Sequence, residues 1–141
     1  MNKAIVAVLF TALVQLVAAQ KATYELIKDE ADLAFYSKWV TLKGENTGKQ
    51  ALFIKVTNKT DRLLSYSLGV EVFVDQVMVE EAPEALYCIR PKKTNQGKVN
   101  CIYFVSDKVT PEDLASGKTV VELTGLVITG ADICPKRQAK K

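Results

Sequence analysis

The length, composition and charge of the chain narrow the classes of protein to which it can belong. It has 141 residues, with 19 Lys and Arg against 16 Asp and Glu, and it has no histidine. The lack of histidine excludes Ser-His-Asp catalysis, Cys-His catalysis and histidine-ligated metals. The near balance of charge argues against a dedicated nucleic-acid binder, which carries a basic stripe with interleaved aromatic residues. We expect a non-enzymatic protein with no cofactor and no metal ion.

The first segment has the pattern of a cleavable secretory signal peptide. A positively charged start precedes an apolar run from Ala4 to Ala19, and the small side chain of Ala19 suits a cut before Gln20. The run is shorter than the about 20 apolar residues of a membrane-spanning helix. No cysteine lies near the cut, which excludes a bacterial lipoprotein, because a lipoprotein needs a cysteine as its first mature residue. We expect removal of residues 1–19, a secreted or periplasmic mature protein, and no membrane span.

The rest of the chain predicts strands, because apolar and polar residues alternate with a period near two over most of its length. The clearest strand carries Tyr66, Leu68 and Val70 on one face and Ser65 and Ser67 on the other. Helical patterns are scarce. The expected strands, in chain order, span residues 23–28, 33–42, 52–57, 65–74, 77–81, 85–90, 99–105 and 119–129.

One short helix is expected between the last two strands. Thr110 can cap its start, and Pro111 suits the first helical position. The acidic residues that follow favour the positive end of the helix dipole, and Gly117 suits the exit. The sequence therefore predicts one or two helical turns here.

These elements predict an all-β fold, an immunoglobulin-like two-sheet sandwich of about eight strands with one short helical turn. We place this single domain at residues 20–134, followed by a basic flexible tail at 135–141. The strand at 52–57, the Asn-centred turn after it, and the long and Pro-bounded strands that follow resemble the immunoglobulin-like modules of small exported proteins of Gram-negative bacteria. The resemblance implies the fold and carries over no active site.

The three cysteines, Cys88, Cys101 and Cys134, predict one disulfide and one remaining thiol in an oxidising compartment. A hairpin centred on Thr94-Asn95 would set Cys88 opposite Cys101, close enough to bridge. We therefore expect this pair, with a bond from Cys134 to one of the other two as the alternative. The spacing, without CxxC, fits no zinc site.

Two groups of side chains are candidates for ligand binding. Phe35 and Trp39 can form an aromatic platform for a sugar or a protein partner, although a lone Trp in a small sandwich more often lies in the core. Glu80, Glu81 and Glu84 cluster around an expected turn, where acids can flank a sugar or bind Ca²⁺. A solvated acidic loop is the more common reason for such a cluster.

The segment Asn58-Lys59-Thr60 matches the N-glycosylation pattern. The same residue types are typical of a turn between two strands. We expect the turn, and glycosylation is relevant only in a eukaryotic secretory pathway.

Three functional hypotheses follow from these features. The first is an exported binding or structural module, which meets another protein of the envelope or the extracellular space through its loops or a sheet edge. The second is a carbohydrate-binding or carbohydrate-active protein that uses the Glu80–Glu84 loop and exposed aromatic residues. A third, a thiol-redox role, needs an exposed cysteine with a partner in reach.

Overall fold

The computed structural model describes residues 23–134 of the chain. The predicted signal peptide at 1–19, the cut before Gln20 and the predicted tail at 135–141 lie outside the described residues. Within the described range, no helix is long and apolar enough to span a membrane.

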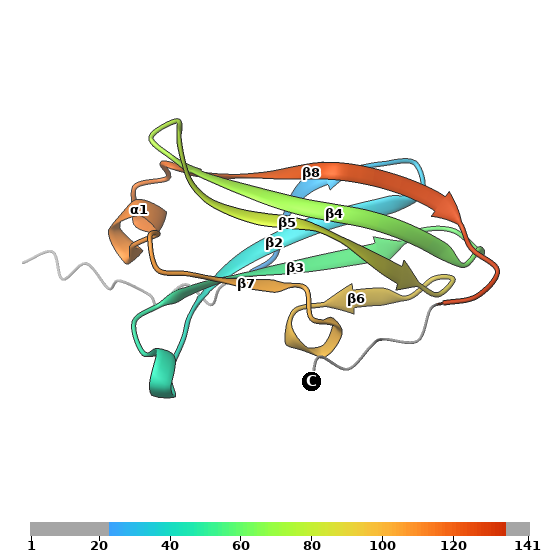
Figure 1. The fold of residues 1–141 in the computed structure, drawn as a ribbon, viewed down its shortest axis with the longest axis horizontal. Coiled ribbons are helices and arrows are strands. Elements are labelled where there is room, and N and C mark those ends of the chain that lie inside the picture. The colour runs from blue at the N-terminus through green and yellow to red at the C-terminus, as the bar shows by residue number, and fades with distance from the viewer. Residues whose placement is uncertain (1–22, 135–141) are drawn as a thin grey trace, which may run out of the picture.

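Two antiparallel sheets pack face to face, as Figure 1 shows. The strands are β1 (Glu25–Asp29), β2 (Leu33–Thr41), β3 (Gln50–Asn58), β4 (Leu64–Val74), β5 (Val77–Ile89), β6 (Thr94–Gln96), β7 (Tyr103–Ser106) and β8 (Thr119–Gly130). The helices are η1 (Gly44–Asn46), η2 (Lys98–Asn100) and α1 (Pro111–Ala115). The five-stranded sheet has the order β1-β2-β3-β6, with β7 also paired to β3, and the three-stranded sheet has the order β5-β4-β8. The predicted all-β two-sheet sandwich is confirmed.

The core lies between the two sheets, because the central strands alternate buried and exposed side chains. In β4, the buried Leu64, Tyr66 and Leu68 face the five-stranded sheet, as the sequence alternation predicted. The ring of Phe35 on β2 meets the ring of Tyr66 edge to face, with centroids 6.0 Å apart. Each fully buried large apolar side chain stabilises the fold by about 1.5–3 kcal/mol. Those in the core are Leu33, Phe35, Leu52, Ile54, Val56, Leu64, Tyr66, Leu68, Val70, Ile89 and Ile102.

The strands predicted at 77–81 and 85–90 form the single strand β5. The strand continues past Pro83 because β5 is an outer strand, where a residue without an N–H is tolerated. A register shift between the pairs of Leu68 and Val70 absorbs the extra residue as a bulge. The turn expected between the acidic residues is therefore wrong. Between the strands expected at 65–74 and 77–81, Asp75 and Gln76 form the turn, with positive φ angles of 50° and 68°.

The chain between Cys88 and Cys101 is not a hairpin. Cys88 lies on β5 of the three-stranded sheet, and the chain then crosses to the five-stranded sheet, where β6 and β7 pair with β3. Cys88 is bonded to Cys134, with Cα atoms 5.6 Å apart, and Cys101 is a free, exposed cysteine. The predicted Cys88–Cys101 pair is wrong because its two residues belong to different layers, and the alternative with Cys134 is correct.

The predicted helix is confirmed as α1, with its predicted ends. The hydroxyl of Thr110 accepts a hydrogen bond from the backbone N–H of Asp113, and the Asp113 carboxylate accepts bonds from the N–H and hydroxyl of Thr110. This reciprocal capping box satisfies donors that the helix itself leaves free. Gly117 ends the turn with a φ of 71°, a conformation that glycine adopts without strain. The cap fixes where β8 begins.

Candidate functional site

The predicted aromatic platform does not form. Phe35 is fully buried in the core, so the hypothesis that its ring faces a ligand is wrong. Trp39 lies on the same inward face of β2 but remains partly exposed, because it sits near one open side of the sandwich. Of the two predicted aromatic residues, only Trp39 borders solvent.

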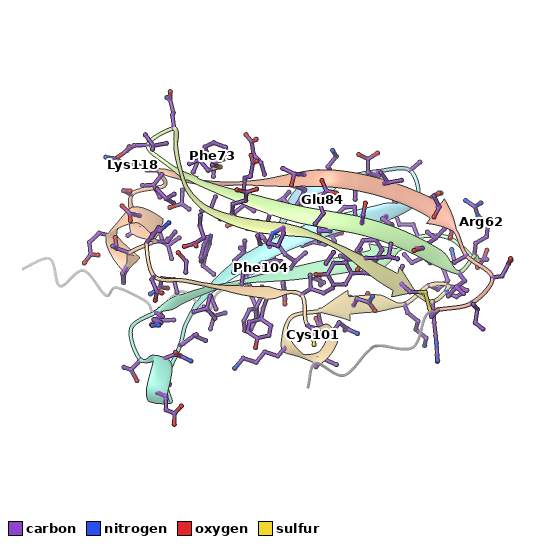
Figure 2. The ribbon with its side chains drawn as sticks, viewed as in Figure 1. Arg62, Phe73, Glu84, Cys101, Phe104 and Lys118 are labelled. Atoms are coloured by element: carbon purple, nitrogen blue, oxygen red, sulfur yellow. A yellow bond between two sulfur atoms is a disulfide. The ribbon has the colours of Figure 1, made fainter. Side chains whose placement is uncertain are left out.

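The three predicted acids do not converge on one point. The carboxylate of Glu80 accepts a hydrogen bond of 2.9 Å from the hydroxyl of Ser106, which links β5 to β7 across the layers. Glu81 lies opposite Glu71 on β4. The side chain of Glu84 covers Gly125 of β8, and Figure 2 shows Glu84 on the layer of β4, β5 and β8. Within residues 23–134, no group of three or more Cys, Asp or Glu side chains is placed to hold a metal ion.

Asn58 is a turn residue with a buried amide. Its Nδ2 donates to the backbone oxygens of Arg62, at 2.8 Å, and Arg90, at 3.1 Å. Its Oδ1 accepts from the N–H and the hydroxyl of Thr60. The predicted turn is therefore confirmed, and the amide joins the end of β3 to the end of β5.

An open cleft lies between the two sheets on the side where β1 faces β8. It has a volume of about 880 Å³, which is within the range of ligand-binding clefts in proteins. We call it the β1–β8 cleft. Its lining residues are Thr23, Glu25 and Ile27 from β1 and the residues before it, Ser37, Lys38 and Trp39 from β2, Leu114, Ala115 and Gly117 in and after α1, and Thr119 and Val121 from β8.

The cleft combines apolar walls with a few polar groups. Ile27, Leu114 and Val121 pack against the core and leave part of their surface to the cleft. The hydroxyl oxygen of Thr119 is buried and forms no hydrogen bond within the described residues. An unsatisfied buried hydroxyl costs about 1–3 kcal/mol.

The strand that forms one rim of the cleft has a free backbone edge. β8 is the outer strand of its sheet and pairs with β4 alone among the described strands. Its 12 residues contain one charged side chain, Glu122, and no proline. The register is regular from Thr119 to Thr124, beside the cleft, and shifts only where Gly125 has a positive φ. An outer strand with so little charge is suited to pairing with another chain.

Sequence reasoning found the strand at 119–129 and singled out Trp39, but it did not bring them together. The low charge of residues 119–130 was the available signal. It becomes informative only when the topology shows that this strand is an outer one. No protein-family model matches the chain, and no curated protein has a significantly similar sequence.

Proposed function

We propose that the protein is an exported, non-enzymatic binding module that holds an extended segment of a partner protein along the free edge of β8. The observation that carries the proposal is the regular, nearly uncharged edge of β8 beside an open cleft. The partner belongs to the cell envelope or the extracellular space.

The mechanism is the addition of a strand to a sheet. Backbone groups of the partner segment pair with the free N–H and C=O groups of β8, which supplies affinity without regard to sequence. Alternate side chains of an extended segment point to opposite faces. Every second side chain of the partner segment therefore enters the β1–β8 cleft and contacts Trp39 and Leu114. The remaining side chains lie beside Val120 on the outer face of the sheet.

The cleft also specifies the chemistry of the segment. Apolar side chains suit its walls. The carboxylate of Glu25 at the rim favours a basic residue at one end. The expected segment alternates apolar residues with polar ones and carries few acids.

Carbohydrate binding through Phe35 and the acidic residues is not favoured. Phe35 is inaccessible, and Glu80 is bonded to Ser106. A thiol-redox role lacks a second thiol, because Cys88 and Cys134 are bonded to each other. The β8 edge is the surface that supports a function best.

The test compares two matched variants. Met78 on β5 and Val120 on β8 both flank Phe73 in the register, and they are 49% and 51% exposed. A phage-displayed library of random peptides, each as long as the 12 residues of β8, is selected against the wild-type protein. We expect alternating apolar peptides to be enriched, to keep binding to Met78→Lys, and to lose binding to Val120→Lys.

Met78→Lys controls for any effect of a lysine on the outer face, because only Val120 belongs to the free β8 edge. Equal loss of binding in both variants, or no enrichment of extended apolar peptides, would contradict the proposal.

A further inference from the structure

The outward face of the five-stranded sheet carries a cluster of aromatic rings and lysines. We call it the aromatic–lysine face. The Nζ of Lys55 lies 4.3 Å from the ring centre of Tyr36 and 4.9 Å from that of Tyr24. The Nζ of Lys38 lies 4.5 Å from the ring centre of Tyr24 and 5.8 Å from that of Phe53. Each cation–π contact of this kind favours a position of the ammonium group above the sheet by about 0.5–1 kcal/mol.

The positive charge of this face is not neutralised within the domain. No ion pair among residues 23–134 involves Lys38 or Lys55. Exposed apolar side chains share this face: Leu26 lies opposite Tyr36 and Tyr103 lies opposite Phe53. Burial raises the pKa of the Tyr24 phenol above its ordinary value. The face is therefore cationic and apolar.

The outward face of the three-stranded sheet has the opposite charge. Glu71 on β4 lies directly opposite Glu81 on β5 and Glu122 on β8, which forms a row of three carboxylates across the sheet. Like charges directly opposite one another destabilise a sheet. These three carboxylates form no ion pair within the described residues. We call this surface the glutamate face.

Exposed apolar side chains flank the glutamate row on both sides. On one side of the row, Met78 of β5 and Val120 of β8 lie opposite Phe73 of β4. On the other side of the row, Leu86 of β5 and Val127 of β8 lie opposite Ser67 of β4. Their side chains are 66% and 60% exposed. Figure 2 shows Phe73 on the layer that carries this face. Several large apolar side chains on one sheet face indicate a contact with another protein.

We propose that the aromatic–lysine face of one copy of this chain docks on the glutamate face of a second copy. Each face supplies what the other lacks: Lys38 and Lys55 meet the row of Glu71, Glu81 and Glu122, and the surrounding apolar side chains pack together. Complementary charge selects the partner face and its orientation. This contact uses side chains on the flat faces of the sandwich, whereas the proposed strand addition uses the backbone edge of β8.

The geometry also sets the form of the assembly. The two faces lie on opposite sides of the sandwich, since each is the outward side of a different sheet (Figure 1). A contact between two different surfaces repeats from copy to copy and does not close into a twofold dimer. The product is an open stack whose length rises with protein concentration and falls with salt.

The experiment measures the mass of the protein in solution and exchanges the charges. Sedimentation velocity of the wild-type protein at low ionic strength should give species of at least about twice the monomer mass, which disappear when salt screens the faces. The double variant Lys38→Glu/Lys55→Glu should be monomeric. Glu71→Lys/Glu122→Lys should also be monomeric. A mixture of the two variants should assemble, because each now offers a face complementary to the other.

A control variant changes the net charge by the same amount as Lys38→Glu/Lys55→Glu without touching either face. Lys43→Glu/Lys108→Glu alters two exposed lysines outside the strands and should assemble like the wild type. Thermal unfolding of each variant identifies any that fails to fold, and the salt dependence of the wild type tests the proposal without a variant. A wild-type protein that stays monomeric at low ionic strength, or a mixture of folded variants that stays monomeric, would overturn it.

Discussion

The two outer strands of the three-stranded sheet, β5 and β8, differ in how they are protected. β5 carries Pro83, several glutamates and a bulge, all of which hinder pairing with another chain. β8 carries only Glu122 as a charged residue, and its bulge at Gly125 lies beyond the part that borders the cleft. Two strands of similar length on one sheet therefore have opposite suitability for binding.

The sides of the sandwich that these strands border differ in the same way. On the β5 side, the hydrogen bond between Glu80 and Ser106 joins the two layers. On the β8 side, the layers separate around the β1–β8 cleft. The protected strand β5 therefore borders the side on which the layers are joined, and the unprotected strand β8 borders the open cleft. The predictions below test this difference, from the largest expected effect to the smallest.

The disulfide is the covalent tie between the two outer strands, since Cys88 lies on β5 and Cys134 follows β8. It closes a loop with a sequence separation of 46, for which the chain-entropy model gives about 4 kcal/mol of stabilisation. We expect Cys88→Ser/Cys134→Ser to lower the free energy of unfolding in urea by about that amount. Cys101→Ser should change it by less than about 0.5 kcal/mol. An equal loss in both variants would show that the disulfide is not the cause.

The amide of Asn58 fixes the end of the protected strand, because it donates to the backbone oxygen of Arg90 directly after β5. Asn58→Asp removes the donor and buries a carboxylate among carbonyl oxygens. We expect a loss of about 3 kcal/mol in unfolding free energy, measured in urea. Asn46→Asp, the same change at an exposed turn, should cost less than about 0.5 kcal/mol. A small effect at Asn58 would mean that the turn does not depend on its amide.

The hydrogen bond between Glu80 and Ser106 is expected to close the β5 side. A double-mutant cycle of Glu80→Ala and Ser106→Ala should give a coupling energy of about 1 kcal/mol by thermal or urea unfolding. The cycle is needed because the Ser106 hydroxyl also accepts from the backbone of Lys108 and Val109. Glu81→Ala, on the opposite face of β5, is the matched control and should show no coupling with Ser106. Coupling near zero for Glu80 would remove the physical basis for calling this side closed.

The smallest expected effect is a pH dependence of stability that arises at the capping box of α1, the helix before β8. The backbone N–H of Thr110, followed by its hydroxyl, lowers the pKa of Asp113 by hydrogen bonding to the carboxylate. Because the folded pKa is depressed, the stabilisation is complete above the ordinary range of an aspartate and is lost as the pH falls through the lowered value. A carbon NMR titration should find the pKa of Asp113 below the ordinary value of an aspartate. Thr110→Ala should raise its pKa only partly, because the backbone donor remains.

Much of the fold follows from local patterns in the sequence. The alternation around Tyr66 predicts β4 and its buried face, and the residues from Thr110 to Gly117 predict α1 with its cap. These features depend on contacts within a few residues or on one repeating period. They therefore need no knowledge of how the strands are ordered.

The features that sequence reasoning missed depend on strand order. Pro83 indicates the end of a strand because it has no backbone N–H to donate. Only the strand order shows that β5 is an outer strand, in which such a residue is tolerated. The pairing of Cys88 depends on whether the next strand joins the same sheet or the other, and a local hairpin is only one of those outcomes. The cleft needs β1 and β8, which are far apart in the sequence, to border the same side. Local patterns do not contain this information.

The buried amide of Asn58 has a consequence for producing the protein. In a eukaryotic secretory pathway, an oligosaccharide is attached to the nascent chain before the turn closes, and the Asn58-Lys59-Thr60 triplet is an acceptor for it. The native fold leaves 1% of Asn58 accessible and uses its nitrogen as a donor to two neighbouring segments. A sugar on that nitrogen and the folded domain exclude each other. We therefore expect a bacterial host, which does not attach this oligosaccharide, to yield more folded protein than a eukaryotic host that modifies Asn58.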